Sequence, residues 1–167
     1  MSSTLPHARG QHAHQIDAID RRILKLLQDD GRMTNVDVAA RVGLTAPPSL
    51  RRIRALEEAG VIQGYHASIS PAALGWDVVG FAMVSLKSQA EADLCAFEAH
   101  VAALPQVREC HMLNGEIDFL LKIVARDLPD FHAYLTGHLT SAPNVASVKT
   151  SLTIRTAKAL PGVPLEV

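Results

Sequence analysis

Residues 16–60 read IDAIDRRILKLLQDDGRMTNVDVAARVGLTAPPSLRRIRALEEAG, and three helical patterns follow one another in this stretch. The first pattern, over about 17–29, repeats apolar residues at steps of three and four, which places them on one helical stripe. The second is short, with Thr34 suited to cap its start and Gly43 suited to end it. The third begins after Thr45, another good N-cap residue. This order predicts three packed helices.

Two helices joined by a tight turn that contains glycine form the helix-turn-helix pattern of DNA-binding proteins. On the third helix, Leu50, Ile53 and Leu56 are expected to be buried, so the arginines near them face outward or flank that side. Arginines on the second helix of such a motif suit contacts with phosphates and base edges. A solvated helix face is the alternative. The expected DNA-binding residues are Thr45, Pro47, Pro48, Ser49, Arg51, Arg52 and Arg54.

The segments on either side complete this predicted domain. Residues 1–15 show no apolar period and are expected to be a disordered polar tail, in spite of three histidines that a metal site would use. Residues 61–69 contain two extended pieces around a glycine, which indicates a small wing or a strand leaving the motif. The sequence therefore predicts a winged helix-turn-helix over 16–69, followed by a Pro- and Gly-containing linker over 70–77.

The pattern changes at residue 78, and residues 78–158 form a second predicted domain. Strand-like and helix-like runs alternate here, with Asn114-Gly115 as a hairpin signal between two strands. The runs are 78–87 (strand), 90–103 (helix), 107–113 and 117–125 (strands), 128–140 (helix) and 145–157 (strand). The order βαββαβ predicts an α+β, ferredoxin-like domain. Residues 159–167 are expected to be an exposed, disordered tail.

Two strands of this second domain are apolar on both faces. Phe119, Leu121 and Ile123 alternate with Leu120 and Val124, so both sides of that strand are hydrophobic. The two helices of a ferredoxin-like domain cover only one face of the sheet. We therefore expect a second subunit to cover the other face, and a homodimer would align two recognition helices with two DNA half-sites.

Composition and charge set the remaining bounds. The chain of 167 residues is 48% hydrophobic and 20% charged, which is typical of a globular protein. Nine Lys/Arg against seven Asp/Glu in 1–64 make that part mildly basic, whereas seven against ten make 65–167 acidic. We find no membrane-length apolar run and no signal peptide, and the two cysteines lack metal-ligand spacing. The expectation is a cytoplasmic protein without metal or cofactor.

The turn between the second and third strand-like runs offers chemistry for a small ligand. An amino acid needs an acceptor for its ammonium group and N–H donors for its carboxylate. Asp118 can supply the acceptor, and the backbone around Gly115 can supply donors because glycine permits close approach. The alternative role for Asp118 is to cap N–H groups of the turn. No nucleophile with an adjacent base, phosphate loop or catalytic carboxylate pair is present in the sequence, so we do not expect an enzyme.

Over residues 16–158 the sequence resembles the Lrp/AsnC, or feast/famine, regulators. The resemblance is carried by 16–65 and by ECHMLNGEIDFLLKI (109–123), which contains the Gly-x-x-Asp-aromatic signature of the sensing domain. It is closest to the leucine-responsive branch, although Ser151 stands where that branch often has a bulkier residue. The resemblance implies dimers that assemble into tetramers or octamers, and double-stranded DNA as a partner. It also implies amino acids or related metabolites as effectors, bound between the sensing domains of neighbouring dimers.

The expected effector-binding residues lie near the 114–118 turn and on the last strand. They are Met112, Asn114, Gly115, Glu116, Asp118, Ser151 and Thr153. Two other functions remain open from the sequence. One is a sirohaem-decarboxylase-like enzyme of the same architecture, which would carry a coloured cofactor. The other is a metabolite-binding module that does not bind DNA.

Overall fold

The computed structural model describes residues 15–166, so the predicted N-terminal tail and its histidines lie outside the described residues, apart from residue 15. Contacts divide the chain into two compact units. The first runs to Ser68 and includes the C-terminal segment from Ala159, and the second is Ile69–Lys158. Within the described residues, no helix is both long enough and apolar enough to cross a membrane.

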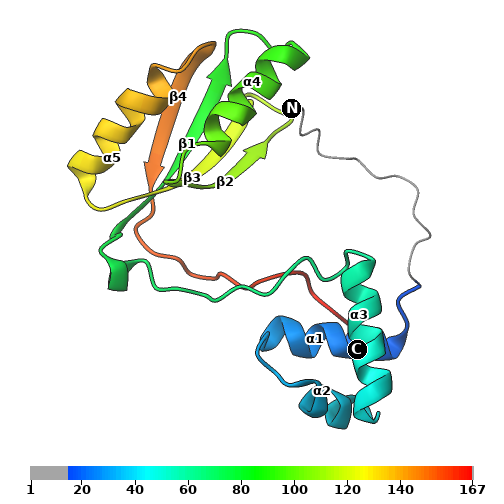
Figure 1. Cartoon of the computed structure of the whole chain (residues 1–167). Coiled ribbons are helices and arrows are strands. Elements are labelled where there is room, and N and C mark those ends of the chain that lie inside the picture. Colours follow the sequence, from blue (N-terminus) through cyan, green and yellow to red (C-terminus); the bar gives the residue numbers. More distant parts are fainter. Residues whose placement is uncertain (1–14, 167) are drawn as a thin grey trace. The chain divides into compact units, whose positions relative to one another are not determined.

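The first unit contains the three predicted helices, α1 (Ala18–Asp29), α2 (Asn35–Val42) and α3 (Ala46–Glu58), shown in Figure 1. As predicted, the Thr34 side chain accepts a hydrogen bond from the Asp37 backbone, and Gly43 ends α2 in the left-handed conformation with φ of 74°. The helices enclose a small apolar core. Its fully or nearly fully buried members are Ile23, Val38, Val42, Ile53 and Leu56.

The face that α3 buries differs from the prediction in two places. Leu50 was expected inside but is 36% exposed, and Ser49 is completely buried instead. Ser49, Ile53 and Leu56 follow steps of four and three, so they share one helical face, from which Leu50 is rotated away. Thr45 has the extended backbone of an N-cap residue but makes no side-chain capping hydrogen bond.

The segment after α3 is extended, but residues 61–70 form no strand, so the expected wing has no ladder of its own. This segment begins folded back on α3, because Val61 and Ile62 both donate their N–H groups to the Leu56 carbonyl at 2.9 and 3.1 Å. Further on, the Tyr65 hydroxyl donates to a Glu57 carboxylate oxygen at 2.9 Å. Burial, followed by the Glu57 hydrogen bond and charge, raises the pKa of Tyr65 to about 12.

The second unit has the predicted βαββαβ order. Its four strands are β1 (Val78–Leu86), β2 (Val107–Met112), β3 (Phe119–Ala125) and β4 (Val145–Leu152). They form one sheet in the order β2-β3-β1-β4 with every neighbouring pair antiparallel. This is the ferredoxin-like arrangement that the sequence predicts. The last strand is shorter than expected, since β4 ends at Leu152 instead of residue 157.

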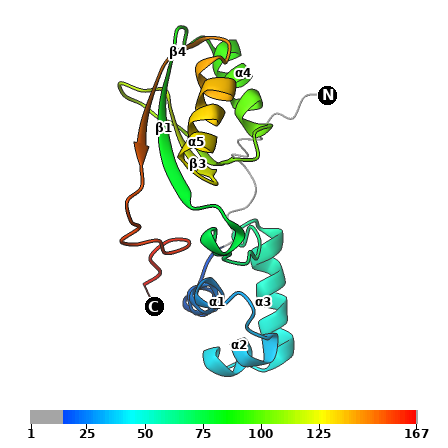
Figure 2. The same cartoon turned by 90° about the vertical axis from the view of Figure 1, so that its left-hand side faces the viewer.

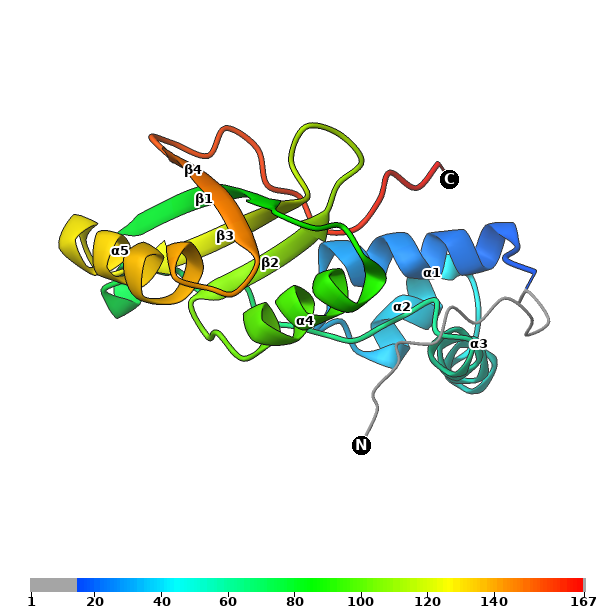
Figure 3. The same ribbon diagram turned by 90° about the horizontal axis from the view of Figure 1, so that it is seen from above.

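Both helices of this unit lie on the same side of the sheet, as Figures 2 and 3 show. They are α4 (Glu91–Ala102) and α5 (Leu128–Tyr134), and a π-helical turn (Leu135–Thr140) continues α5 to the predicted end of that helix. The core between helices and sheet includes Phe97 and Phe119, whose ring centroids are 4.8 Å apart. The Phe131 ring packs closely on Gly80. A Cβ atom at residue 80 would lie 2.5 Å from the Phe131 ring.

The opposite face of the sheet carries a group of apolar side chains, as the alternating pattern predicts, together with Lys122 opposite Phe81. Along β1 and β3, helix-facing side chains are buried, and the side chains between them are only half-buried. The half-buried apolar side chains of this face are Val79, Phe81, Met83, Leu120 and Val124. We call this set the open face.

The C-terminal tail is not the detached segment that its composition suggests. The Gln28 side chain donates to the Val163 carbonyl at 2.9 Å and accepts from the Val163 N–H at 3.1 Å. Gly162, with φ of 67°, lies so close to Gln28 that a Cβ there would overlap its side-chain amide. These contacts attach the tail to α1 although its apolar side chains, such as Leu160, remain exposed.

Candidate functional site

The exposed face of α3 carries two arginines of the predicted DNA-binding set. Arg51 and Arg54 are three residues apart, which makes them neighbours on the helix surface. Both are exposed, and neither forms an ion pair with any residue of the part of the chain that the structure describes. Thr45 and Pro47 are also exposed beside them, and Pro48 is half-buried. These residues form a surface we call the cationic face.

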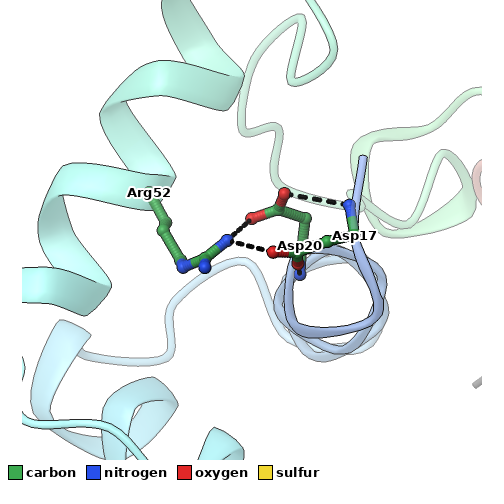
Figure 4. Close-up of polar contacts among 3 residues, drawn as sticks. All are labelled: Asp17, Asp20 and Arg52. Carbon is green, nitrogen blue, oxygen red and sulfur yellow. Dashed lines mark hydrogen bonds and ion pairs between the residues drawn. The ribbon is translucent and has the colours of Figure 1, made fainter. Parts of the chain in front are cut away.

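Ser49 and Arg52, which the sequence assigns to the same set, lie elsewhere. Ser49 is completely buried in the helical core. Arg52 points toward the start of α1, where its Nη1 atom donates to Asp17 and Asp20 at 2.8 Å each, as Figure 4 shows. Arginine spacing alone therefore does not tell which of the three side chains faces outward.

The two aspartates that receive Arg52 also form the capping box of α1. The Asp20 N–H donates to the Asp17 carboxylate at 2.8 Å, and the Asp17 N–H donates to the Asp20 carboxylate at 3.2 Å. The backbone hydrogen bond from Asp20, followed by the hydrogen bond from Arg52, lowers the pKa of Asp17. Hydrogen bonds to Asp20 and Asp17 raise the pKa of Arg52.

In the second unit, Asp118 occupies the point where β3 begins. Its side chain is buried, and its two oxygens accept from the Leu86 N–H and from the Gln89 side chain, both at 2.7 Å. Its backbone also bonds to both sides, with its N–H donating to Val84 and its carbonyl accepting from Leu113. The carboxylate thus joins β1 to the hairpin and does not cap N–H groups of its own turn.

A pocket of about 400 Å³ opens beside Asp118. Its walls come from β2, from the loop between β2 and β3, from the loop after β1 and from α4. They are Gln89, Leu94, Met112, Leu113, Asn114, Gly115 and Asp118. The space around Gly115 is open, since nothing lies within 4 Å of a Cβ built there. The predicted effector set does not contain three of these residues, Gln89, Leu94 and Leu113. No local sequence signal shows that Gln89 and Leu94 contact the hairpin, and Leu113 belongs to the predicted strand 107–113.

Three residues of the predicted effector set do not line this pocket: Glu116, Ser151 and Thr153. The register explains why Ser151 is distant. Met112 pairs with Phe119, which pairs with Val84, whereas Ser151 pairs with Phe81 on the same strand as Val84. Ser151 therefore lies three strand spacings across and three residues along, roughly 14 and 10 Å away. The Asn-Gly hairpin is also longer than expected, with a loop closed by the Leu113–Asp118 backbone bond at 2.8 Å.

The described histidines, cysteines and carboxylates are the side chains that a metal site would use. Within residues 15–166 no cluster of three or more His, Cys, Asp or Glu side chains could hold a metal ion. Both cysteines are free thiols. Burial, followed by the charge of Glu98, raises the pKa of Cys110 to about 11, which keeps it protonated at neutral pH.

The fold, the cationic face and the pocket together define a two-domain protein with a helix-turn-helix and a ligand-binding domain. The sequence matches the winged helix-turn-helix DNA-binding family over residues 16–63 and the Lrp/AsnC ligand binding domain over residues 79–163. The chain belongs to the Lrp/AsnC family of transcriptional regulators.

The chain is similar to proteins named as transcriptional regulators, and the similarity extends over most of their length. The chain is 55% identical over 144 residues to the leucine-responsive regulatory protein of Rhizobium meliloti, covering 86% of this chain and 92% of that protein. It is 38% identical over 151 residues to the Bkd operon transcriptional regulator of Pseudomonas aeruginosa, covering 90% of this chain and 99% of that protein.

Solved structures agree with this assignment. A Neisseria meningitidis transcriptional regulator, solved as a complex with L-Met, superposes with a TM-score of 0.85 at 34% identity, covering 89% of this chain and 96% of that one. AsnC of E. coli superposes with a TM-score of 0.81 at 25% identity, covering 89% and 99%.

The contacts of Asp118 generate a stability prediction. Replacing Asp118 with Ala leaves the buried Leu86 N–H without its acceptor, so unfolding free energy is expected to fall by about 2 kcal/mol. Urea denaturation followed by circular dichroism measures this change. Glu116→Ala, an exposed neighbour in the same loop, is the control and is expected to leave stability unchanged. Equal stability of the two variants would show that the carboxylate does not hold the hairpin.

Proposed function

We propose that this regulator binds operator DNA through α3 as a homodimer and that an amino acid bound in the Asp118 pocket modulates this binding. The main support for DNA binding is the cationic face. Its residues Arg51 and Arg54 are exposed and have no carboxylate partner in an ion pair among the described residues. Guanidinium groups at such positions suit phosphates and the O6 and N7 atoms of guanine. Because its target is DNA, we place the protein in the cytoplasm.

The pocket suits an amino acid with an apolar side chain. Leu94, Met112 and Leu113 provide apolar walls, and the Asp118 carboxylate provides a negative group to attract an ammonium. Each Asp118 oxygen accepts a hydrogen bond from the protein, and a carboxylate oxygen can accept a second. The similarity to a Neisseria meningitidis regulator solved with L-Met supports this class of effector. Ser151 and Thr153 would join the site only from a neighbouring subunit.

The open face provides the surface for the homodimer. Its half-buried apolar side chains are covered by neither α4 nor α5, which both pack on the other side of the sheet. An apolar face that is uncovered in the monomer favours association with a second copy. A twofold dimer would present two α3 helices to two half-sites of one operator. Assembly of dimers into tetramers or octamers, as in the family, is part of this proposal.

The first test concerns DNA. Arg51→Ala is expected to weaken binding to a preferred DNA duplex by about 1–3 kcal/mol and, if Arg51 contacts a phosphate, to reduce the salt-dependence slope by about 0.9. Fluorescence anisotropy over a salt series measures both quantities. Lys87→Ala removes one exposed charge from the other unit and is the matched control. Unchanged binding by both Arg51→Ala and Arg54→Ala would refute the assignment of the cationic face.

The second test concerns the effector. In a thermal-shift screen of the twenty amino acids, those with apolar side chains are expected to raise the Tm, because a ligand that binds only the folded state stabilises it. Met112→Glu places a carboxylate at the pocket wall and is expected to abolish the shift. Arg108→Glu lies on the same strand outside the pocket lining and is expected to keep it. A response only to charged amino acids would contradict the proposed specificity.

The third test concerns the dimer. Phe81→Asp puts a charge at the centre of the open face, so the full-length variant is expected to become monomeric at micromolar concentration. Light scattering after size-exclusion chromatography measures the mass. Thr150→Asp, an exposed change on β4 that faces the other side, is expected to remain dimeric. A wild-type protein that is itself monomeric would argue against the open face as an interface.

A further inference from the structure

We propose that Arg52 is a positioning residue: it fixes α3 against the capping box of α1 and so sets the direction in which the cationic face meets DNA, without touching the DNA itself. This inference rests on the proposed DNA-binding function. It assigns to Arg52 a role different from that of Arg51 and Arg54, although the three arginines are almost consecutive in sequence.

The geometry shows what Arg52 connects. Its Nη1 lies 2.8 Å from oxygens of both Asp17 and Asp20, the N-cap and N3 residues of α1. These two residues are 35 and 32 positions earlier in the chain. One guanidinium nitrogen thereby joins the body of α3 to the first turn of α1 (Figure 4).

Because Asp20 is buried, separating Arg52 from it would cost free energy. The Asp20 side chain is 3% exposed, and that of Arg52 is 32% exposed. Moving Arg52 away to reach a phosphate would deprive a buried carboxylate of this cation, and breaking a buried ion pair is strongly destabilising. Arg51 and Arg54, which are exposed, can reach a phosphate without such a loss.

Charge leads to the same assignment. Asp17 and Asp20 each lie 2.8 Å from the Arg52 Nη1 atom, so their carboxylates offset its positive charge where a phosphate would have to bind. The exposed Arg51 and Arg54 have no such carboxylate in an ion pair among the described residues. Because the apolar core of this unit is small, a directional ion pair adds an orientation that nonpolar contacts alone leave less defined.

This inference can be tested by removing the negative charge of Asp17 and measuring whether DNA affinity rises or falls. Asp17→Asn keeps an N-cap side chain that caps as well as Asp but removes the charge that pairs with Arg52. Simple electrostatics predicts tighter DNA binding when an acidic residue is lost. A positioning role of Arg52 predicts the opposite, namely that DNA binding weakens by about fivefold. This change is at the lower end of the coupling typical between two sites of a protein. Asp29→Asn, an exposed change at the other end of α1, is the matched control and is expected to bind unchanged or slightly more tightly.

The probe is a duplex enriched from a random-sequence DNA library by the wild-type full-length protein, with a scrambled duplex of equal length beside it. Anisotropy titrations over a salt series give affinity and slope for the wild type, Asp17→Asn, Asp29→Asn and Arg52→Ala. Arg52→Ala is expected to weaken binding to the enriched duplex with an unchanged salt slope. Adding Asp17→Asn to Arg52→Ala is expected to cause no further loss, because the pair is already broken.

The outcomes separate this inference from the proposed function. Binding by Asp17→Asn that equals or exceeds that of the wild type overturns the positioning role. A slope that falls by about 0.9 in Arg52→Ala also overturns it, because that result identifies a phosphate contact. A wild-type protein that enriches no sequence and binds neither duplex overturns the DNA-binding proposal itself. If Arg52→Ala does not fold, Asp17→Asn with its control still decides the question.

Discussion

The buried carboxylate of Asp118 ties together the parts of the ligand-binding unit that surround the pocket. It accepts from the backbone at the end of β1 and from the Gln89 side chain in the following loop, each at 2.7 Å, and it immediately precedes β3. The pocket walls on either side come from these same segments. A buried carboxylate without hydrogen-bond donors costs free energy. The structure is therefore most stable when Leu86 and Gln89 stay within hydrogen-bond distance of Asp118.

The helix-turn-helix unit uses a similar device at a different place. Asp20 is buried there, as Asp118 is in the other unit, and Arg52 brings a cation to it from a distant helix. In both units the apolar core brings the elements together, and a buried aspartate joins two segments that are distant in sequence. The two differ in the partner: Asp118 is held by neutral N–H donors, whereas Asp20 receives a guanidinium.

The sequence predicts the elements well because their signals are local. Apolar periodicity, the Thr34 cap and the alternation along β3 each depend on residues a few positions apart, and all are found in the structure. Contacts between distant segments carry no such signal. Periodicity does not distinguish Ser49 from Leu50 at the edge of a helical face, and it does not reveal that Arg52 meets Asp17. Side-chain pairs set by tertiary packing therefore needed the structure.

The pocket lies beside a strand that also supplies side chains to the open face. Asp118 lies at the pocket, and Leu120, two residues along, belongs to the open face, because side chains alternate along a strand. On the proposed function, a ligand that donates to Asp118 adds a hydrogen bond to oxygens that already bind Leu86 and Gln89. Any change in these contacts would act on β1 and β3, and both strands supply side chains to the open face. A free-energy coupling of about 1–3 kcal/mol, typical of allosteric proteins, is enough to change how two copies of the sheet pack.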